Sequence, residues 1–424
     1  MKLLFKNIRA VDPSQGLDCI TDITVTDGII SGISENKSAV YADRIIEGKG
    51  SLVAAPGLFD MHVHFRDPGQ TYKEDILTGA AAAKAGGFTG AACMPNTKPP
   101  IDSPESVRYV IDKARQTGIN IIPFAAVTKG MKGEELTDQK ALLEAGACGL
   151  SEDGRPVENA ELMRRALELT NDSGMLISSH CEDLRIINGG IINKGEISRK
   201  LGVRGMDRAS EDYITAREIA LAASCGARVH ICHVSTYGSV NIIRAAKRDG
   251  IKVTCETAPH YFTYTDEKLL SRDADYRMSP PLRTERDRQA IEEAVLDGTI
   301  DCIITDHAPH SADEKSVFES APNGVVGLET SLAVTLTRLY HTGKLSLSRM
   351  IELMSVNPRK ILGLAPVSIK IGEPADMCIF DPELRWEVIP AELHSKSKNT
   401  VFKGEKLRGR NIMTLCGGKI VYEL

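Results

Sequence analysis

The chain has 424 residues, a length that suits either two or three average domains or one large α/β barrel with insertions. Its 52 basic and 57 acidic residues give a formal charge of −5, which excludes a broad electrostatic surface for nucleic acid or an anionic membrane, so we expect a small-molecule partner. The ten cysteines are scattered without a CxxC pair, no signal-peptide pattern opens the chain, and no run of about eighteen apolar residues occurs, so we expect a cytoplasmic protein with free thiols.

The first 52 residues carry short alternating β patterns at 3–8, 20–26 and 29–33. From Leu58 onward the pattern changes to a repeat of apolar strand, polar loop and amphipathic helix. The expected strands are 58–63, 88–94, 119–127, 146–151, 175–180, 228–234, 251–257 and 301–305. The expected helices between them are 72–85, 104–116, 158–171, 212–225, 239–249 and 286–296.

This alternation of strands and helices over about 300 residues predicts a (β/α)8 barrel of the TIM type. An open doubly wound sheet is the competing α/β fold, but no GxGxxG or GxxxxGK[ST] loop follows the first strand. After a helical pattern at 347–362, β patterns return at 379–381, 386–389, 400–402, 406–407 and 420–422. Neither terminal segment is long enough to bury a core alone, so residues 1–52 and 366–424 are expected to pair into one small β-sandwich domain beside a barrel of residues 53–365.

Two histidines, His62 and His64, fall where the first expected barrel strand ends. Residues i and i+2 of an extended chain point to the same side, so both imidazoles can face one metal ion. A catalytic zinc site needs about three protein ligands, and two histidines at a loop entrance can also be purely structural. The remaining ligands must therefore come from other strands.

Catalytic groups of a barrel gather at the carboxyl ends of its strands, and metal-ligand residue types stand at several of these ends. The fourth strand ends in Glu152 and Asp153, the fifth in His180, the sixth in His233 and the eighth in Asp306. Each would more often be an ordinary core residue if it stood alone, but together with the histidine pair they predict a metal centre.

Four histidines and two carboxylates exceed what one tetrahedral zinc ion uses, so we expect one or two Zn²⁺ ions and favour two that share a hydroxide. Many barrel hydrolases bridge two metals with a carboxylated lysine at the fourth strand, but residues 146–153 contain no lysine. Asp153 is the expected replacement, with Glu152 as second choice. Asp306 is expected to act as ligand and as general acid and base.

Other strand ends carry groups suited to a polar substrate, namely Arg66, Asn96 and His310. Arg66 is the most informative of them, because a guanidinium is the natural bidentate partner of a carboxylate. A surface salt bridge is its alternative role.

A set of motifs in this order resembles the dihydroorotase family of the amidohydrolase superfamily, in its larger bacterial form. The motifs are DMHVHFRDPG (60–69), YKEDILTGA (72–80), MPNT (94–97), SEDGRPV (151–157), HCED (180–183), CHVST (232–236), SPPLR (279–283), TDHAPH (305–310), GVVGLET (324–330) and PADMCIFD (374–381). The resemblance covers the barrel and the C-terminal β segment. It implies zinc ligands at His62, His64, Asp153, His180, His233 and Asp306.

The same resemblance implies that Arg66, Asn96 and His310 bind a substrate carboxylate, and that the enzyme interconverts N-carbamoyl-L-aspartate and (S)-dihydroorotate in pyrimidine synthesis. Two positions depart from the family pattern. Ser279 stands where asparagine is usual, so we expect a substrate contact of shorter reach, and residues 321–323 differ before Gly324, which concerns the closing of the 311–323 loop.

Related hydantoinases, dihydropyrimidinases and allantoinases would share the barrel and the metals. Arg66 and the missing lysine of the fourth strand weigh against the first two, and the full motif set weighs against the third. A catalytically inactive homologue that serves as a structural partner is disfavoured, since all six ligand positions hold competent residues. We further expect a homo-oligomer, with a dimer as the simplest form, and association with aspartate transcarbamoylase.

Overall fold

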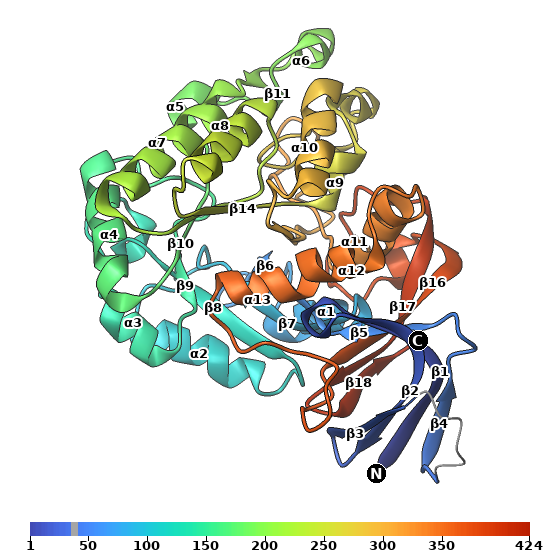
Figure 1. Ribbon diagram of the computed structural model, residues 1–424. Coiled ribbons are helices and arrows are strands. Elements are labelled where there is room, and N and C mark those ends of the chain that lie inside the picture. Colours follow the sequence, from blue (N-terminus) through green and yellow to red (C-terminus); the bar gives the residue numbers. More distant parts are fainter. Residues whose placement is uncertain (35–40) are drawn as a thin grey trace.

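The computed structural model describes residues 1–34 and 41–424, in which two large sheets dominate (Figure 1). The first is parallel, with its strands in the order β15-β14-β13-β10-β9-β8-β7-β6. Its strands are β6 (Leu58–Val63), β7 (Phe88–Cys93), β8 (Asn120–Ala126), β9 (Gly149–Ser151), β10 (Ile177–Ser179), β13 (Val229–Ile231), β14 (Val253–Thr257) and β15 (Cys302–Ile303). The sheet closes because His64 N donates to His307 O at 2.7 Å and Val63 bridges His307. The expected barrel is confirmed.

All eight strands lie inside the ranges expected from the sequence, but several are shorter. β10 ends at Ser179, directly before His180, and β15 ends at Ile303, shortly before Asp306. The chain leaves the ladder where polar site residues begin, because a side chain that turns toward the barrel mouth no longer follows the alternation of the sheet.

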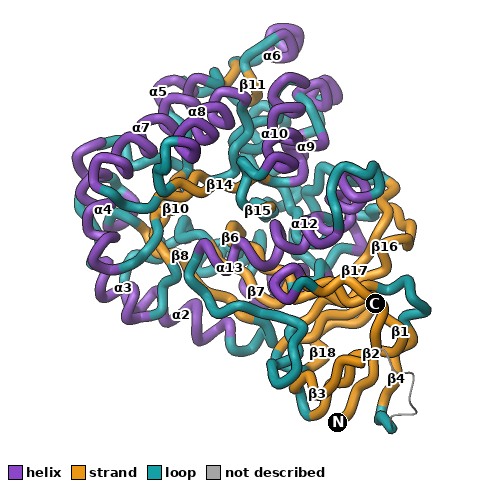
Figure 2. Tube along the Cα trace, in the orientation of Figure 1, coloured by secondary structure: helices purple, strands orange, loops and turns teal. Residues whose placement is uncertain are grey.

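Helices pack around the barrel in an outer ring (Figure 2). They include α1 (Ile76–Ala85), α2 (Pro104–Ala114), α3 (Gln139–Ala145), α4 (Ala160–Ser173), α7 (Ala209–Cys225), α8 (Tyr237–Arg248) and α10 (Glu285–Asp297). α1 begins four residues later than expected, because the Asp75 side chain accepts from Leu77 N and Thr78 N and so caps the helix. Lys73 and Glu74 therefore lie before the helix, in the loop that follows β6. No helix in the described ranges is long and apolar enough to cross a membrane.

Shorter helices complete the chain. They are η1 (Pro13–Gln15), η2 (Lys129–Met131), α5 (Leu184–Ile187), α6 (Glu196–Leu201), α9 (Pro259–Thr263), η3 (Asp266–Ser271), η4 (Ala274–Tyr276), α11 (Ser331–Thr335), η5 (Leu336–Tyr340), α12 (Leu347–Ile351), η6 (Glu352–Val356), α13 (Asn357–Ile361) and η7 (Pro390–Glu392). The helix expected at 347–362 is thus α12 and α13 joined by a π-helical turn, η6. A small two-stranded sheet, β11 (Ile192–Asn193) with β12 (Gly205–Met206), follows the fifth barrel strand.

The second large sheet joins both ends of the chain, whose blue and red strands lie side by side in Figure 1. Its strands are β1 (Lys2–Asp12), β2 (Leu17–Thr26), β3 (Ile29–Ser34), β4 (Arg44–Glu47), β5 (Val53–Pro56), β16 (Met377–Glu387), β17 (Lys406–Cys416) and β18 (Lys419–Glu423). They follow the order β18-β17-β16-β5-β1-β2-β3, and β4 also pairs with β1. Apolar side chains from both termini, such as Phe5, Val25, Met377 and Leu415, bury a separate core there.

Three details of the C-terminal β patterns differ from expectation. The patterns at 379–381 and 386–389 are one strand, β16, and the strand expected at 406–407 continues to Cys416 as β17. The strand expected at 400–402 is wrong. There the Thr400 hydroxyl accepts from Phe402 N, so a local turn takes the place of a ladder.

The chain passes from the terminal sheet into the barrel at Gly57, so β5 belongs to the terminal sheet. Gly57 N donates to Asp376 O at 3.0 Å, and Gly57 O accepts from Arg359 Nη1 at 2.8 Å. A Cβ at Gly57 would lie 2.2 Å from Thr89 Cγ2, so only glycine fits. Buried Arg359 also donates to Thr89 Oγ1 at 2.9 Å, which ties this junction to β7.

Candidate metal centre

Side chains from five strand ends converge at the carboxyl end of the barrel. His62 Nε2 lies 3.3 Å from Asp153 Oδ1, and His64 Nε2 lies 3.4 Å from Asp153 Oδ2. Asp306 Oδ1 lies 3.2 Å from His64 Nε2 and 3.7 Å from His62 Nε2. These four side chains are buried, so they form one desolvated group of two imidazoles and two carboxylates.

A second group shares Asp153 with the first. His180 Nδ1 lies 3.3 Å and His233 Nε2 lies 3.6 Å from Asp153 Oδ1, and these two imidazole nitrogens are 2.9 Å apart. Burial raises the pKa of Asp153, but the surrounding histidines outweigh burial and hold the pKa well below its usual range. Asp153 is therefore ionised and touches both groups.

The donor set fits two divalent metal ions. The ligand atoms of His62, His64 and Asp153 lie within 4.8 Å of one another, and so do those of Asp153, His180 and His233. His62 Nε2 and Asp153 Oδ1 are buried and have no hydrogen-bond partner among the described residues, as expected of atoms that face a cation. Imidazole nitrogen and carboxylate oxygen are both ligands of zinc.

Glu152, the second choice for a bridging ligand, points away from the cluster. Its carboxylate accepts from Thr128 N at 3.1 Å and from the Thr128 hydroxyl. Asp153 alone of the pair lies among the histidines.

Three of the histidines are held from behind by side chains that contact the nitrogen on the far side of the ring. Glu256 Oε1 lies 2.6 Å from His62 Nδ1, and Glu182 Oε2 lies 3.1 Å from His180 Nε2. Such contacts fix the tautomer and leave the other nitrogen free for a metal. The sequence analysis missed both roles, although a carboxylate inside the apolar strand 251–257 was a usable signal for Glu256.

The third histidine, His64, is held in the same way by Asn96, and Ser279 contacts Glu182. Asn96 Oδ1 lies 2.9 Å from His64 Nδ1, and Asn96 Nδ2 donates to Asp153 Oδ2 at 3.3 Å. Ser279 Oγ donates to Glu182 Oε2 at 2.5 Å.

Arg66 lies beside the cluster as a buried cation, with 9% of its surface exposed. Nε donates to Pro309 O at 3.2 Å, and Nη2 lies 3.3 Å from His310 Nε2. Burial lowers the pKa of Arg66, yet a guanidinium keeps its proton in proteins. No carboxylate in the described ranges lies within 4.0 Å of it, so this charge lacks a partner.

His310 is oriented by a second buried cation that the sequence analysis missed, Lys73. Lys73 Nζ lies 3.2 Å from His310 Nδ1 and 2.9 Å from Glu314 Oε1. An ammonium can only donate, so Nδ1 accepts and the ring proton sits on Nε2, which donates to Asn323 O at 2.9 Å. The Nε2–H therefore points toward Asn323 O, and the approach of Arg66 Nη2 to the same nitrogen is a contact between two donors, not a hydrogen bond.

Three of these residues adopt left-handed backbone conformations, Arg66 at φ 57°, His233 at φ 31° and Asp306 at φ 47°. Such conformations cost energy for residues other than glycine and persist only where the surrounding fold imposes them. At these strand ends they turn the side chains toward the common centre.

Comparisons with known proteins agree with this geometry. A family profile described as "Dihydro-orotase-like" matches residues 51–239. The chain is 49% identical to the dihydroorotase of Geobacter sp. (strain M21) and 48% identical to that of Geobacter metallireducens (strain ATCC 53774 / DSM 7210 / GS-15), in both cases over 100% of each chain. Among solved structures it is similar to the L-hydantoinase (dihydropyrimidinase) of Arthrobacter aurescens, with 26% identity, a TM-score of 0.88 and coverage of 99% of this chain and 96% of that one. The D-hydantoinase (dihydropyrimidinase) of Thermus sp. has the same fold, with 24% identity, a TM-score of 0.84 and coverage of 100% and 96%. Because these relatives are near half identical over their full length, the chain belongs to the dihydroorotase family of cyclic amide hydrolases.

Proposed function

We propose that the chain is a zinc-dependent dihydroorotase that interconverts N-carbamoyl-L-aspartate and (S)-dihydroorotate in de novo pyrimidine synthesis. The observation that carries the proposal is Arg66, a buried cation without a carboxylate partner beside the candidate metal centre. A buried unpaired charge is costly, so such a site favours a ligand that supplies the missing anion. Dihydroorotate carries a carboxylate, whereas hydantoin and dihydrouracil do not.

The carboxylate would lie between Arg66 and His310. The Nε2–H of His310 now donates to Asn323 O, and a substrate oxygen can accept the same proton. Lys73 keeps His310 in this donating tautomer. Asn96, which contacts His64 and Asp153, holds the side of the pocket nearest the metal ligands and offers its amide to the same substrate group.

The metal ions would be held by His62, His64, Asp153, His180, His233 and Asp306. When bound, zinc supplies the Lewis acidity that makes water nucleophilic near neutral pH and polarises an amide carbonyl.

Asp306 would move the proton. Its Oδ1 faces His62 and His64, which leaves Oδ2 to accept a proton from the attacking water and later to deliver it to the departing ring nitrogen. Burial raises the pKa of Asp306, but the neighbouring histidines outweigh burial and lower the pKa, so the carboxylate begins as a base.

A hydantoinase-like or allantoinase-like activity is the second candidate, because the solved structures reported above are hydantoinases. The substrate charge separates the two candidates. We expect the protein to open dihydroorotate far faster than dihydrouracil or hydantoin, in an assay of ring opening with zinc-loaded protein.

Arg66→Ala tests the same point by mutation. It should lower kcat/KM for dihydroorotate by about 10² or more while the zinc content stays unchanged, because a charge-assisted bidentate contact is lost. Arg66→Lys should recover only part of the loss, since an ammonium keeps the charge without the planar fork. Faster turnover of dihydrouracil, or an unchanged rate on dihydroorotate in Arg66→Ala, would replace the proposal with the hydantoinase-like one.

A further inference from the structure

The partly buried Ser279 and the buried Glu182 form a hydrogen-bonded pair next to His180. Glu182 is 1% exposed, and its Oε2 accepts both from Ser279 Oγ at 2.5 Å and from His180 Nε2 at 3.1 Å. On the other side of the ring, His180 Nδ1 lies 3.3 Å from Asp153 Oδ1. A continuous line of contacts therefore runs from Ser279 to the carboxylate shared by both metal groups.

The anchoring of Glu182 depends on few contacts. Its Oε1 is buried and has no hydrogen-bond partner in the described part of the chain. Oε2 is thus the only anchored oxygen, and Ser279 supplies one of its two contacts. Without the serine hydroxyl the carboxylate keeps a single hydrogen bond, which does not stop it from rotating away from His180.

The hydroxyl of Ser279 already donates its proton in a hydrogen bond. A serine carries one O–H donor, and here that donor goes to Glu182, so Ser279 has no proton left to offer a substrate. An asparagine at this position would have two amide donors and could serve Glu182 and a substrate together.

We propose that Ser279 is a positioning residue for the metal ligand His180 rather than a substrate contact. It orients Glu182, and Glu182 holds the His180 ring with Nδ1 facing Asp153. The inference rests on the proposed metal centre and concerns zinc binding, so it does not depend on which cyclic amide is hydrolysed.

Zinc affinity and KM separate the two roles. In metal-free protein titrated with Zn²⁺ against a chromogenic chelator, Ser279→Ala should bind its weaker zinc about tenfold less tightly, in line with the loss of an outer partner of a metal ligand. With zinc at saturation, KM for dihydroorotate should remain within about twofold of the unmodified protein, a shift that removal of a substrate contact would exceed. Ser279→Thr keeps the hydroxyl and should restore the affinity.

Two further variants serve as controls. Ser331→Ala removes a serine hydroxyl that is buried and has no hydrogen-bond partner in the described ranges, and it should leave zinc affinity unchanged. In a Glu182→Gln background, Ser279→Ala should weaken zinc binding by much less than it does alone, because both residues act through one path. Thermal unfolding of each variant shows whether it is folded.

An unchanged zinc affinity in Ser279→Ala would overturn the inference. If KM for dihydroorotate also rose in that variant, Ser279 would be a substrate-binding residue instead. The inference would also be overturned if Ser279→Ala lowered zinc affinity by the same factor in the unmodified protein and in the Glu182→Gln background. If the protein binds zinc as described but does not open dihydroorotate, the proposed substrate fails while the role of Ser279 stands.

Discussion

Asp153 is the residue that makes one centre out of two groups. Its carboxylate lies within 3.6 Å of nitrogens on His62, His64, His180 and His233, whereas its neighbour Glu152 is turned to Thr128. A carboxylate has two oxygens and several lone pairs, so one side chain can serve two cations without any modification. We therefore propose that Asp153 serves as the shared metal ligand in place of a carboxylated lysine.

Asp153→Ala should lower the zinc content and the activity of the purified protein, because both metal groups lose a shared anion. Added bicarbonate should not affect the recovery of activity when zinc is returned to the metal-free form. Glu152→Gln is the matched control, since it alters the adjacent carboxylate outside the cluster and should retain zinc. A bicarbonate requirement, or a carboxylated lysine in the mass spectrum, would refute the assignment.

Asp306→Asn tests the proton path. The amide keeps the size and one coordinating oxygen but cannot take up a proton, so turnover should fall by about 10² or more with the fold intact. The measurement is steady-state turnover beside a zinc count. Near-normal turnover with metals bound would assign the proton to another group.

The loop 311–323 lies beside His310 and is anchored at several points. Lys315 Nζ donates to Ala274 O and Arg277 O at 3.0 Å each and to Pro322 O at 2.9 Å. Phe318 packs into a small cluster with Ile192 and other apolar residues. The loop is thus held as a folded element, with Asn323 O in contact with His310.

Lys315→Met keeps most of the apolar stem and removes three hydrogen bonds, so the loop should hold its position less well. We expect KM for dihydroorotate to rise by about tenfold, the equivalent of roughly one net hydrogen bond, while zinc content stays constant. Hydrogen exchange of the loop peptides should become faster. Ser316→Ala is the control, because the Ser316 hydroxyl contacts only Asp313 O within the loop. Unaltered KM and exchange would mean that Lys315 does not anchor the loop.

The strands of the barrel, and the strand-end residues that converge at the candidate metal centre, could be predicted because both follow from local sequence pattern and from the barrel fold. The run at 58–63 is apolar except for residues that face the site, and β6 has the same bounds. Glu256 escaped prediction because its role arises from a contact with His62, 194 residues earlier, which no local periodicity reports. Lys73 was assigned to a helix because the capping role of Asp75 depends on its side-chain direction. Residues 400–402 have β propensity but lie in a turn. The strand predicted there is wrong because propensity does not indicate whether a partner strand is available.

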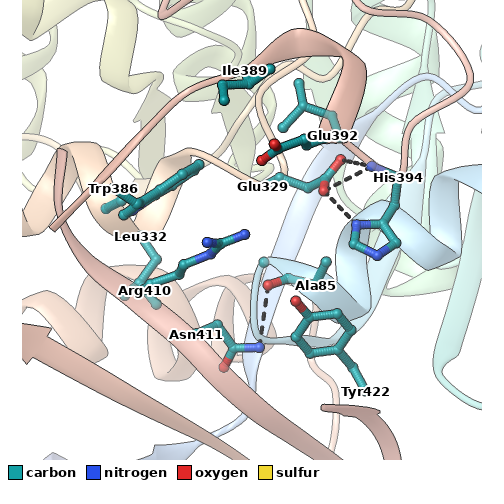
Figure 3. A pocket seen from close by; sticks show the side chains of 13 residues that line it. Ala85, Glu329, Leu332, Trp386, Ile389, Glu392, His394, Arg410, Asn411 and Tyr422 are labelled. Atoms are coloured by element: carbon teal, nitrogen blue, oxygen red, sulfur yellow. Dashed lines mark hydrogen bonds and ion pairs between the residues drawn. The ribbon is translucent and has the colours of Figure 1, made fainter. Parts of the chain in front are cut away.

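At the scale of the whole molecule, the terminal sheet and the barrel are joined by polar contacts around a cavity between α11 and β16 and β17 (Figure 3). Glu329, just before α11, accepts from His394 N at 2.8 Å and from Ser395 N at 3.1 Å, and its carboxylate lies 2.8 Å from His394 Nδ1. Arg410 of β17 lies 4.7 Å from the centre of the Trp386 ring of β16. The segment that returns from β16 to β17 therefore contacts the barrel through the partly buried carboxylate of Glu329, and Glu74 provides a second such contact by accepting from Ser395 Oγ and Lys396 N.

The His394–Glu329 pair predicts a small pH dependence of stability. The hydrogen bond to Glu329 raises the pKa of His394 above 6.5, so the folded state holds this proton more tightly than the unfolded chain does. The stabilisation is complete below pH 6.5 and is lost as pH rises through the higher folded-state pKa. The His394 side chain is 44% exposed, so solvent screening limits the effect to a few tenths of a kcal/mol.

Urea unfolding of the zinc-loaded protein at about pH 6 and about pH 8 measures this effect. The same measurement is made on His394→Gln, because titrations common to both proteins cancel in the difference between their stabilities. The unmodified protein should lose more stability between the two pH values than the variant does, because Glu329 keeps its contacts with the backbone N–H groups of His394 and Ser395 at either pH. His341→Gln is the matched control. Its ring lies at Pro382 O and at the Tyr340 ring, so this substitution removes a histidine while the His394–Glu329 pair stays in place. If His394→Gln and the unmodified protein lose equal stability, the charge of this pair does not help to hold the returning chain. The backbone N–H contacts to Glu329 and to Glu74 then hold it at either pH.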